Sequence, residues 1–435
     1  MTCHPAWAEL ASRLQRAVAD QGLVLHAAGR RGSRQATTGP ASAQAEWRLF
    51  GKNPSEVRVT LFRDNHGWCP YCHKVWMQLE EKQIPYRVEK VSMNCYGTKS
   101  QSFLRKTPRG LLPAIEIDGQ FHTESSFIMR LIEESFPDNQ PLTPSGTDQA
   151  LSLERELFGA WLNWLRGEES QRARRAFEQA MDATESTLER SGGPYFLGDT
   201  FSLADCVFAS SLERIAASIL YYKGLRIRGG RWRHVEAWFR EMETRESYMA
   251  SRSDYHTHVH DLPPQIGGCI ASGTREQKAA ASAIDGTDGR SMHLPLPPLT
   301  VDSLEPGCEN PVHDRLEAAN ALIHCIGGVL QSSNGGDAAD AAFQVVCNAL
   351  IDGVDAVSAT LKHGTIDPSA AASLRHTRDR VSVPRDMSFP AARQLRAHLN
   401  WVADTIDPQL GWVGMPLSTR DRRDTNPVNF GASTL

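Results

Sequence analysis

The spacing of hydrophobic and polar positions changes repeatedly between residues 56 and 140. Some stretches alternate with a period of two, which is typical of strands, and others repeat with a period near 3.6, which is typical of helices. The pattern predicts strands over 57–63 and 86–91, a hairpin over 113–120, and helices over 69–82 and 125–136. Strands and helices that alternate in this way predict a compact α/β domain.

Helical spacing dominates the rest of the chain. From 148 to about 248 no convincing strand interrupts it, and Ser202-Leu203-Ala204-Asp205 has the spacing of an N-terminal capping box. Further helices are predicted over 7–25, 313–331 and 338–361, and from about 390 to 403. We therefore expect an all-α domain after the α/β domain. Extra helices follow it, and they could form a small bundle or dock on the preceding domain.

Changes in composition mark the segment boundaries. Pro, Gly, Ser and Ala gather over 256–300, which is typical of a linker. Residues 26–45 are rich in Arg and Ser and almost free of acid, so this region is either a plastid or mitochondrial address or a flexible leader. The predicted segments are a leader with one helix (1–55), the α/β domain (56–140), the all-α domain (148–255), the linker (256–300) and a helical extension (301–435).

Composition narrows the class of protein. A fraction of 40% hydrophobic and 23% charged residues is typical of a soluble globular protein. The formal net charge of -4 does not favour nucleic acid as a partner, and no apolar run reaches the roughly 18 residues of a membrane-spanning helix. Nine cysteines, an odd number spread thinly, do not resemble a disulfide framework. We therefore expect an intracellular protein, either cytoplasmic or in the plastid stroma.

The sharpest chemical signal is Trp68-Cys69-Pro70-Tyr71-Cys72, which follows a predicted strand and begins a predicted helix. Free backbone N–H groups and the positive end of the helix dipole both stabilise a thiolate on Cys69, so that it attacks disulfides at neutral pH. Pro70 suits the first helical turn because its missing N–H would be unpaired there. Cys72 lies one turn further on, within reach of Cys69 for a disulfide.

Other interpretations of the cysteines and histidines are weaker. Two structural thiols are one alternative, and half of a zinc site is another, but a second C-x-x-C is missing from the sequence and we expect no metal. Cys95 is either a third thiol or an ordinary loop cysteine. His256, His258 and His260 alternate, so they would share a face on a strand. The arginines over 375–396 are typical of a solvated helix face with intrachain ion pairs.

Residues 57–137 resemble the thioredoxin-like N-terminal domain of glutathione transferases, especially the cysteine-bearing omega, lambda and dehydroascorbate reductase classes. The resemblance lies in Cys69-Pro70-Tyr71-Cys72, in Arg109-Gly110-Leu111-Leu112-Pro113-Ala114 and in Thr123-Glu124-Ser125-Ser126. The C-P-Y-C itself is similar to that of glutaredoxins. Residues 148–250 are similar to the all-α C-terminal domain of these transferases.

The resemblance implies that glutathione is the co-substrate. In such proteins the proline that matches Pro113 is cis, the backbone before it pairs with the cysteinyl part of glutathione, and Glu124 and Ser125 hold the γ-glutamyl end. Lys99 matches an omega-class lysine, with Lys106 and Arg109 as rivals. The residues expected to contact glutathione are Pro70, Tyr71, Lys99, Leu112, Pro113, Glu124 and Ser125. Those expected near an acceptor between the two domains are Trp161, Trp164, Arg214, Tyr221 and Tyr222.

Three functions are compatible with these residues. The leading hypothesis is a glutathione-dependent thiol oxidoreductase or transferase, in which Cys69 attacks a mixed disulfide or a small oxidised acceptor such as dehydroascorbate. Because Cys72 is also present, a catalytic cycle that uses both thiols is compatible with the sequence. The alternatives are conjugation of glutathione to an electrophile and a non-catalytic binding module. The resemblance to these transferases also implies a homodimer.

Overall fold

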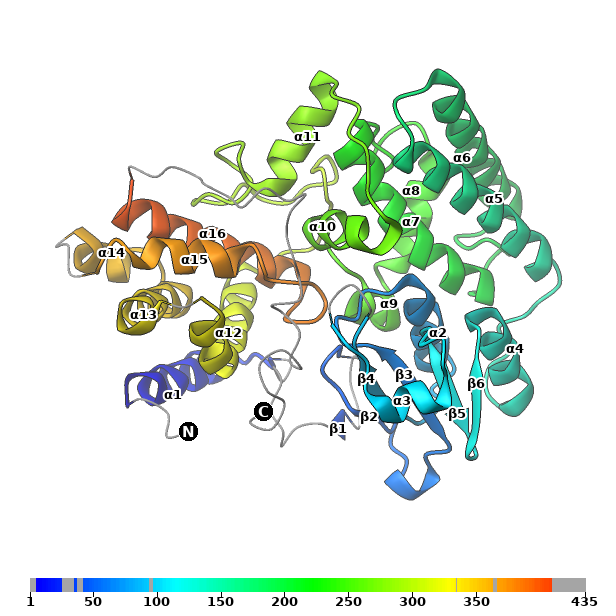
Figure 1. Cartoon of the computed structure of the whole chain (residues 1–435), viewed down its shortest axis with the longest axis horizontal. Helices are drawn as coiled ribbons and strands as arrows, with labels where there is room; N and C mark the ends of the chain where they lie inside the picture. The colour runs from blue at the N-terminus through cyan, green and yellow to red at the C-terminus, as the bar shows by residue number, and fades with distance from the viewer. Residues whose placement is uncertain are drawn as a thin grey trace. The chain divides into compact units, whose positions relative to one another are not determined.

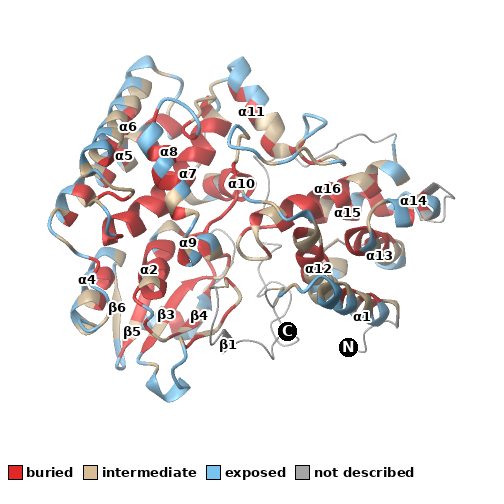
Figure 2. Ribbon diagram, turned by 180° about the vertical axis from the view of Figure 1, so that it is seen from behind, coloured by how far each residue is buried: buried red, intermediate tan, exposed pale blue. Residues whose placement is uncertain are grey.

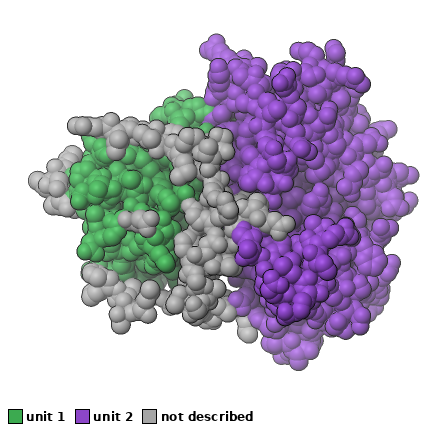
Figure 3. Space-filling view, viewed as in Figure 1, with its two compact units in different colours: residues 1–33, 282–425 green, residues 34–281, 426–435 purple. Residues whose placement is uncertain are grey.

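The computed structural model describes residues 5–25, 35–36, 42–93, 97–333, 335–362 and 366–408. It divides the chain into two compact units (Figure 3). Unit 1 comprises residues 1–33 and 282–425, and unit 2 comprises residues 34–281 and 426–435.

Unit 2 begins with a sheet of six strands in the order β1-β2-β4-β3-β5-β6 (Figure 1). The strands are β1 (Gln35–Ala36), β2 (Trp47–Arg48), β3 (Val59–Asp64), β4 (Tyr86–Val91), β5 (Ala114–Ile117) and β6 (Gln120–Thr123). β3 runs parallel to β4 and antiparallel to β5, so that Val59 lies opposite both Tyr86 and Ile117. The accompanying helices are η1 (Pro54–Glu56), α2 (Pro70–Glu81), α3 (Gln101–Lys106) and α4 (Ser125–Ser135).

The sequence-based prediction of this thioredoxin-like domain is confirmed for β3, β4, the β5–β6 hairpin, α2 and α4. β1, β2 and α3 were not predicted, because two-residue strands and a six-residue helix carry too little periodicity. β2 is fixed instead by a long-range contact. The buried Arg48 donates to Glu80 of α2 at 2.8 and 2.6 Å, a pairing that only the folded chain creates.

The rest of unit 2 is helical, as predicted. Its helices are α5 (Thr147–Arg166), α6 (Gln171–Ser191), α7 (Leu203–Lys223), α8 (Arg233–Met242), α9 (Glu246–Ser251) and α10 (Tyr255–Ile266), with α11 (Arg275–Asp285) crossing into unit 1. α7 is buried along nearly its whole length (Figure 2). The predicted capping box is present at its start, where Ser202 donates from its backbone and hydroxyl to Asp205 at 2.9 and 2.7 Å.

The stretch 256–300 differs from the expected linker, because it contains most of α10 and all of α11. Asp254 caps α10 by accepting from the backbone of Thr257 at 2.9 Å, and the helix packs on α7. The two prolines that suggested a linker, Pro263 and Pro264, fall in the last turn, just before Gly267 closes the helix with φ 82°. Burial against α7 therefore decides the structure of a segment whose composition favours a loop.

Unit 1 combines a helix from the first residues described with helices from the last third of the chain. It contains α1 (Pro5–Asp20), α12 (Pro311–Ser333), α13 (Gly336–Asp352), α14 (Asp355–Lys362), α15 (Ala370–Arg378) and α16 (Phe389–Ile406). Trp7, Leu10 and Leu14 of α1 are buried in the same core as α12 and α13, and the Trp7 ring donates to Asp340 at 2.7 Å. The helix predicted within the leader segment is therefore present as α1, and its apolar face is part of this core.

The arginines of 375–396 also differ from the expected solvated face. Arg375, Arg378 and Arg396 are buried in unit 1. Arg375 donates to Asp404 at 2.9 Å and Arg378 to Asn400 at 2.6 Å, so the intrachain pairing that the sequence suggested is confirmed while the solvation is not. Across the described part of the chain, none of the helices has both the length and the apolar character needed to span a bilayer.

Candidate functional site

Cys69 lies between β3 and α2, directly before the first residue of α2. It is the N-cap residue of α2, its side chain is only 7% exposed, and its carbonyl accepts the first helical hydrogen bond from His73 at 2.9 Å. Pro70 occupies the first turn, as predicted. The sulfur therefore lies at the positive end of a twelve-residue helix whose first N–H groups have no helical partner. This is the environment in which a thiolate is stabilised.

Cys72 lies beside Cys69 and differs from it in environment. The two thiols and a carboxylate oxygen of Asp64 all lie within 4.8 Å of one another, and both cysteines are free. Burial raises the pKa of Cys72 well above its usual range, and the hydrogen bond and charge of Cys69 raise it further. At neutral pH Cys72 is therefore a thiol, which can support a thiolate on its neighbour.

Asp64 was not singled out from the sequence. It ends β3 and is fully buried; one carboxylate oxygen, Oδ2, accepts from the Trp68 backbone at 2.7 Å, whereas Oδ1 has no hydrogen-bond partner among the described residues. The sequence did contain a signal that could have identified Asp64, because it is an acidic residue between the predicted strand and the cysteine motif. Three such donors leave a tetrahedral zinc site one ligand short, and we assign no metal to them.

Arg214 of α7, in the helical part of unit 2, hydrogen-bonds to the loop that precedes Cys69. Its guanidinium donates to the carbonyl of Trp68 and, at 2.5 Å, to that of Ser210, and its Cζ lies 4.9 Å from the centre of the Trp68 ring. Burial lowers the pKa of Arg214, and the negative charges of Glu213 and of the Cys69 and Asp64 side chains oppose that change. Because guanidinium retains its proton even when buried, this is a positive charge close to the proposed nucleophile.

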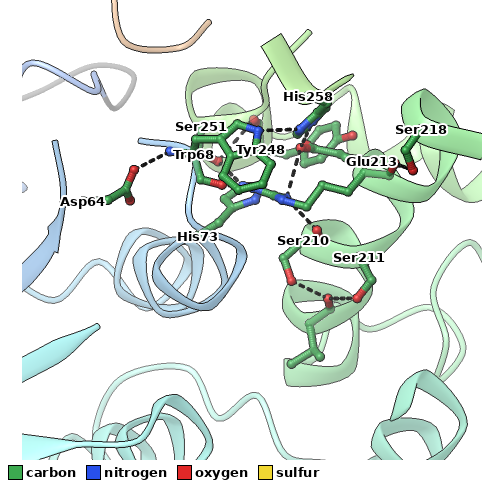
Figure 4. Close-up of polar contacts among 12 residues, drawn as sticks. Asp64, Trp68, His73, Ser210, Ser211, Glu213, Ser218, Tyr248, Ser251 and His258 are labelled. Atoms are coloured by element: carbon green, nitrogen blue, oxygen red, sulfur yellow. Dashed lines mark hydrogen bonds and ion pairs between the residues drawn. The ribbon is translucent and has the colours of Figure 1, made fainter. Parts of the chain in front are cut away.

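His258 completes the support of Trp68 (Figure 4). The indole Nε1 donates to Nδ1 of His258 at 3.0 Å. Since indole is only a donor, Nδ1 is the acceptor and Nε2–H donates to Glu213 at 3.2 Å. Burial lowers the pKa of His258 well below its usual value, so it is neutral. Next to it, Nε2 of His73 lies 2.9 Å from the Ser251 hydroxyl.

The histidine tract therefore differs from the sequence-based expectation. Its residues lie on the helix α10, not on a strand, so alternate positions do not share one face. His258 contacts Trp68, whereas the rings of His256 and His260 lie 4.6 Å apart and one turn away from each other along the helix. The tract contributes His258 to the site, a residue that the sequence did not distinguish from the other two.

The residues expected to hold glutathione lie at the same end of the sheet as Cys69. Ala114, which begins β5, pairs with Phe62 near the end of β3 and with Thr123 at the end of β6. The preceding Leu112–Pro113 bond is cis, as the resemblance implied. Leu112 is half-buried and Pro113 buried. The topology therefore brings the loop 112–113 and the residues after Thr123 to the edge where β3 ends.

Glu124 and Ser125 begin α4. Glu124 is exposed and adopts φ 71° and ψ 104°, a backbone conformation that a residue other than glycine rarely adopts. Ser125 follows as the first helical residue, where backbone N–H groups are free for an anion. Such strained positions gather at sites where the fold must present a side chain to a ligand.

The three candidate cations are placed differently. Lys99 donates to the carbonyl of Ser92, and Lys106 pairs with Glu116 at 2.7 Å. Arg109 is 80% exposed and reaches within 4.0 Å of Glu124. Of these, Arg109 lies nearest to the expected γ-glutamyl end.

The remaining candidates are mostly structural. Trp161 and Trp164 are fully buried, and the Trp161 ring donates to Ser218 at 2.9 Å, so both belong to the helical core. Tyr221 is buried and Tyr222 donates to the carbonyl of Val259 at 2.8 Å. Tyr71 is 40% exposed beside Cys69, and its ring centre lies 6.5 Å from that of Phe158.

Two further predictions concern single residues. Arg214, expected near an acceptor, instead contacts the cysteine loop through Trp68. Cys95 lies outside the described residues.

Comparison with known proteins identifies two domains within unit 2. Residues 68–135 match the family model of the glutathione S-transferase N-terminal domain, and residues 167–241 match that of the C-terminal domain. Glutathione S-transferase DHAR2 of Arabidopsis thaliana is 28% identical over 158 residues, which cover 36% of this chain and 71% of that protein. The chloroplastic glutathione S-transferase DHAR3 of the same plant is 24% identical, covering 49% of this chain and 80% of that protein.

Solved structures give the same kind of neighbour. Glutathione transferase Omega 3C from Trametes versicolor is 28% identical, with a TM-score of 0.39, and covers 45% of this chain and 90% of its own. Chlamydomonas reinhardtii dehydroascorbate reductase is 20% identical, with a TM-score of 0.38, and covers 48% and 95%. The two family models confirm the resemblance inferred from the sequence motifs, for residues 68–135 and 167–241.

Proposed function

We propose that this protein is a glutathione-dependent thiol oxidoreductase that uses Cys69 as its nucleophile. The observation that carries the proposal is the position of the Cys69 sulfur, at the N-terminus of α2 with the buried cation Arg214 among its charged neighbours. Both features favour a thiolate. Conjugating transferases instead need a hydroxyl that stabilises a glutathione thiolate, and a cysteine at that position forms a mixed disulfide.

The proposed reaction is thiol–disulfide exchange. The Cys69 thiolate attacks the glutathionyl sulfur of a mixed disulfide, forming a Cys69–glutathione disulfide and releasing the acceptor thiolate, which takes a proton from water. A second glutathione then attacks the glutathionyl sulfur, which forms oxidised glutathione and releases the Cys69 thiolate. Alternatively, Cys72 attacks the Cys69 sulfur, which releases glutathione and leaves a Cys69–Cys72 disulfide. Reduction of dehydroascorbate would use the same covalent intermediate and consume two glutathione molecules. The names of the Arabidopsis relatives, which carry the DHAR label, support testing this acceptor.

Glutathione in this proposal lies beside the cis-proline loop. The backbone of Leu112 pairs with its cysteinyl part, Pro113 shapes the turn, and Glu124 and Ser125 hold its γ-glutamyl end. Pro70 and Tyr71 line the sulfur side. Lys99 is the proposed partner of the glycyl carboxylate, whereas Arg109, its rival by resemblance, reaches Glu124 at the γ-glutamyl end.

The proposed setting is a reducing compartment, the cytosol or the plastid stroma. The described cysteines are all free, and the relatives include proteins named as cytosolic and as chloroplastic. We further propose a homodimer, by analogy with transferases of this fold.

The test compares three assays on one protein: reduction of hydroxyethyl disulfide, reduction of dehydroascorbate, and conjugation of chlorodinitrobenzene. We expect activity in the first two, and a loss of about 100-fold or more in Cys69→Ser, because a hydroxyl is a poor replacement for a thiolate nucleophile. Cys206→Ala, at a buried cysteine of α7, is the matched control and retains activity. Full disulfide reduction by Cys69→Ser, or conjugation alone in the wild type, would refute the proposal.

A further inference from the structure

The buried carboxylate of Asp64 has a feature that the proposed thiol chemistry does not use. Its side chain is fully buried at the end of β3, and Oδ1 has no hydrogen-bond partner among the described residues. Leaving a buried carboxylate oxygen unpaired costs on the order of 1–3 kcal/mol or more. Such a group needs an explanation, and two thiols lie close to this carboxylate.

The geometry places the Asp64 carboxylate close to the second thiol of the motif. Asp64, Cys69 and Cys72 each have a donor atom within 4.8 Å of the other two. That spacing permits proton transfer after a small change of side-chain rotamer or through one water molecule. Oδ2 of Asp64 is held by the Trp68 N–H at 2.7 Å, which fixes the orientation of the carboxylate.

Cys72 needs a base if it is to react. Burial raises the pKa of Cys72, and the hydrogen bond and charge of Cys69 raise it further. Cys72 is therefore protonated at neutral pH, and a thiol is a poor nucleophile. Once Cys69 is joined to glutathione, its negative charge disappears. The remaining charged groups around Cys72 are then Asp64 and, from α7, the guanidinium of Arg214, which has electrostatic interactions with Cys69, Cys72 and Asp64 alike.

Resting on the proposed function, we infer that Asp64 is the proton acceptor for Cys72 and that the protein works by a dithiol cycle. In the Cys69–glutathione intermediate, the Cys72 proton moves to the carboxylate of Asp64. The Cys72 sulfur then attacks the Cys69 sulfur, the Cys69–glutathione bond breaks, and glutathione leaves as a thiolate that is protonated by water. The Cys69–Cys72 disulfide formed in this step is reduced by two further glutathione molecules, which become oxidised glutathione.

The test follows the intermediate directly. Reduced full-length protein is mixed with oxidised glutathione, quenched with acid at short times, and analysed by intact mass. In the wild type we expect a transient glutathione adduct that is replaced by an internal disulfide. In Cys72→Ser the adduct accumulates. In Asp64→Asn, which still accepts the Trp68 N–H but cannot take a proton, the adduct forms at the wild-type rate and decays about 100-fold more slowly at neutral pH.

A pH series separates a proton acceptor from a structural carboxylate. Decay of the adduct in Asp64→Asn should rise about tenfold per pH unit, because only Cys72 ionised by solvent can then attack, and should approach the wild-type rate in alkali. The wild-type decay should change far less over the neutral range. Asp118→Asn, at an exposed carboxylate of the same domain, is the matched control and should behave as the wild type.

The outcomes keep this inference distinct from the proposed function. A wild-type protein that never forms a glutathione adduct overturns both. An adduct that forms and is resolved only by added glutathione, or one that decays in Asp64→Asn as fast as in the wild type, overturns the inference alone. If Asp64→Asn fails to fold, the pH dependence of adduct decay in the wild type still tests the inference. A decay rate that falls tenfold for each unit by which the pH is lowered through neutrality would mean that no base assists Cys72, and would overturn it.

Discussion

Arg214 donates a hydrogen bond to the carbonyl of Trp68, the residue immediately before Cys69, and its guanidinium carbon lies 4.9 Å from the centre of the Trp68 ring. A helix of the all-α part of unit 2 thus fixes the backbone from which the proposed nucleophile projects. Trp68 also donates to His258 of α10 at 3.0 Å, so two helices hold one loop residue. The position of Cys69 therefore depends on residues far away in the sequence.

Removing the charge of Arg214 should make Cys69 less reactive at neutral pH. In Arg214→Met we expect the iodoacetamide reaction of Cys69 to slow about tenfold at pH 7 and its pH midpoint to move upward, because a nearby cation that stabilises the thiolate is lost. The measurement is the alkylation rate as a function of pH. Arg228→Met, which also removes a buried arginine from unit 2, should lower stability without moving the midpoint. Equal midpoints in both variants would contradict this role for Arg214.

Glu124→Gln should weaken glutathione binding. The carboxylate is exposed at the start of α4 in a strained conformation, where it can pair with the ammonium of the γ-glutamyl group. Loss of that charge should raise the KM for glutathione about tenfold, equivalent to about 1.4 kcal/mol, while alkylation of Cys69 by a neutral reagent stays the same. Glu134→Gln, at an exposed position on the same helix, is the control. An unchanged KM in Glu124→Gln removes this residue from the site.

Acid should destabilise unit 2 through His73. Burial lowers the pKa of this histidine from 6.5 to about 4, so the folded form binds its proton less readily than the unfolded chain does. The stabilisation is complete above pH 6.5 and is lost as the pH falls towards about 4, by about 3 kcal/mol in total. Hydrogen exchange of the α2 amides across this range measures the loss. His73→Gln should flatten the profile, whereas His122→Gln, at a half-buried position of β6, should leave it unchanged.

Trp7→Ala should destabilise unit 1. The Trp7 side chain is 2% exposed within the core formed with α12 and α13, and its ring N–H donates to Asp340. Removing a buried indole costs about 3–5 kcal/mol. Denaturant unfolding followed by hydrogen exchange of α13 should show the loss, and Glu9→Ala on the exposed face of the same helix should not. Unchanged protection of α13 in Trp7→Ala would mean that α1 does not contribute to this core.

The sequence by itself determined the elements that depend on neighbours along the chain. The strand before Cys69, the helix that begins at Pro70 and the capping box at Ser202 were all predictable, because periodicity and capping act over a few residues. The same local order places a thiol at a helix N-terminus, which is the essential chemistry of the candidate site. Family resemblance added the cis bond before Pro113.

Tertiary structure alone decided which distant residues surround that thiol. Arg214 is 146 residues from Trp68 in the sequence, and His258 is 190 residues away. Asp64 is near in sequence, but its unpaired oxygen appears only when β3 and α2 pack and exclude water. The helix α10 and the burial of α1 in unit 1 also follow from packing, because apolar faces that are buried between helices override what local composition favours. Contacts between residues that are distant in the sequence produce no periodic pattern. They could therefore be identified only from the folded structure.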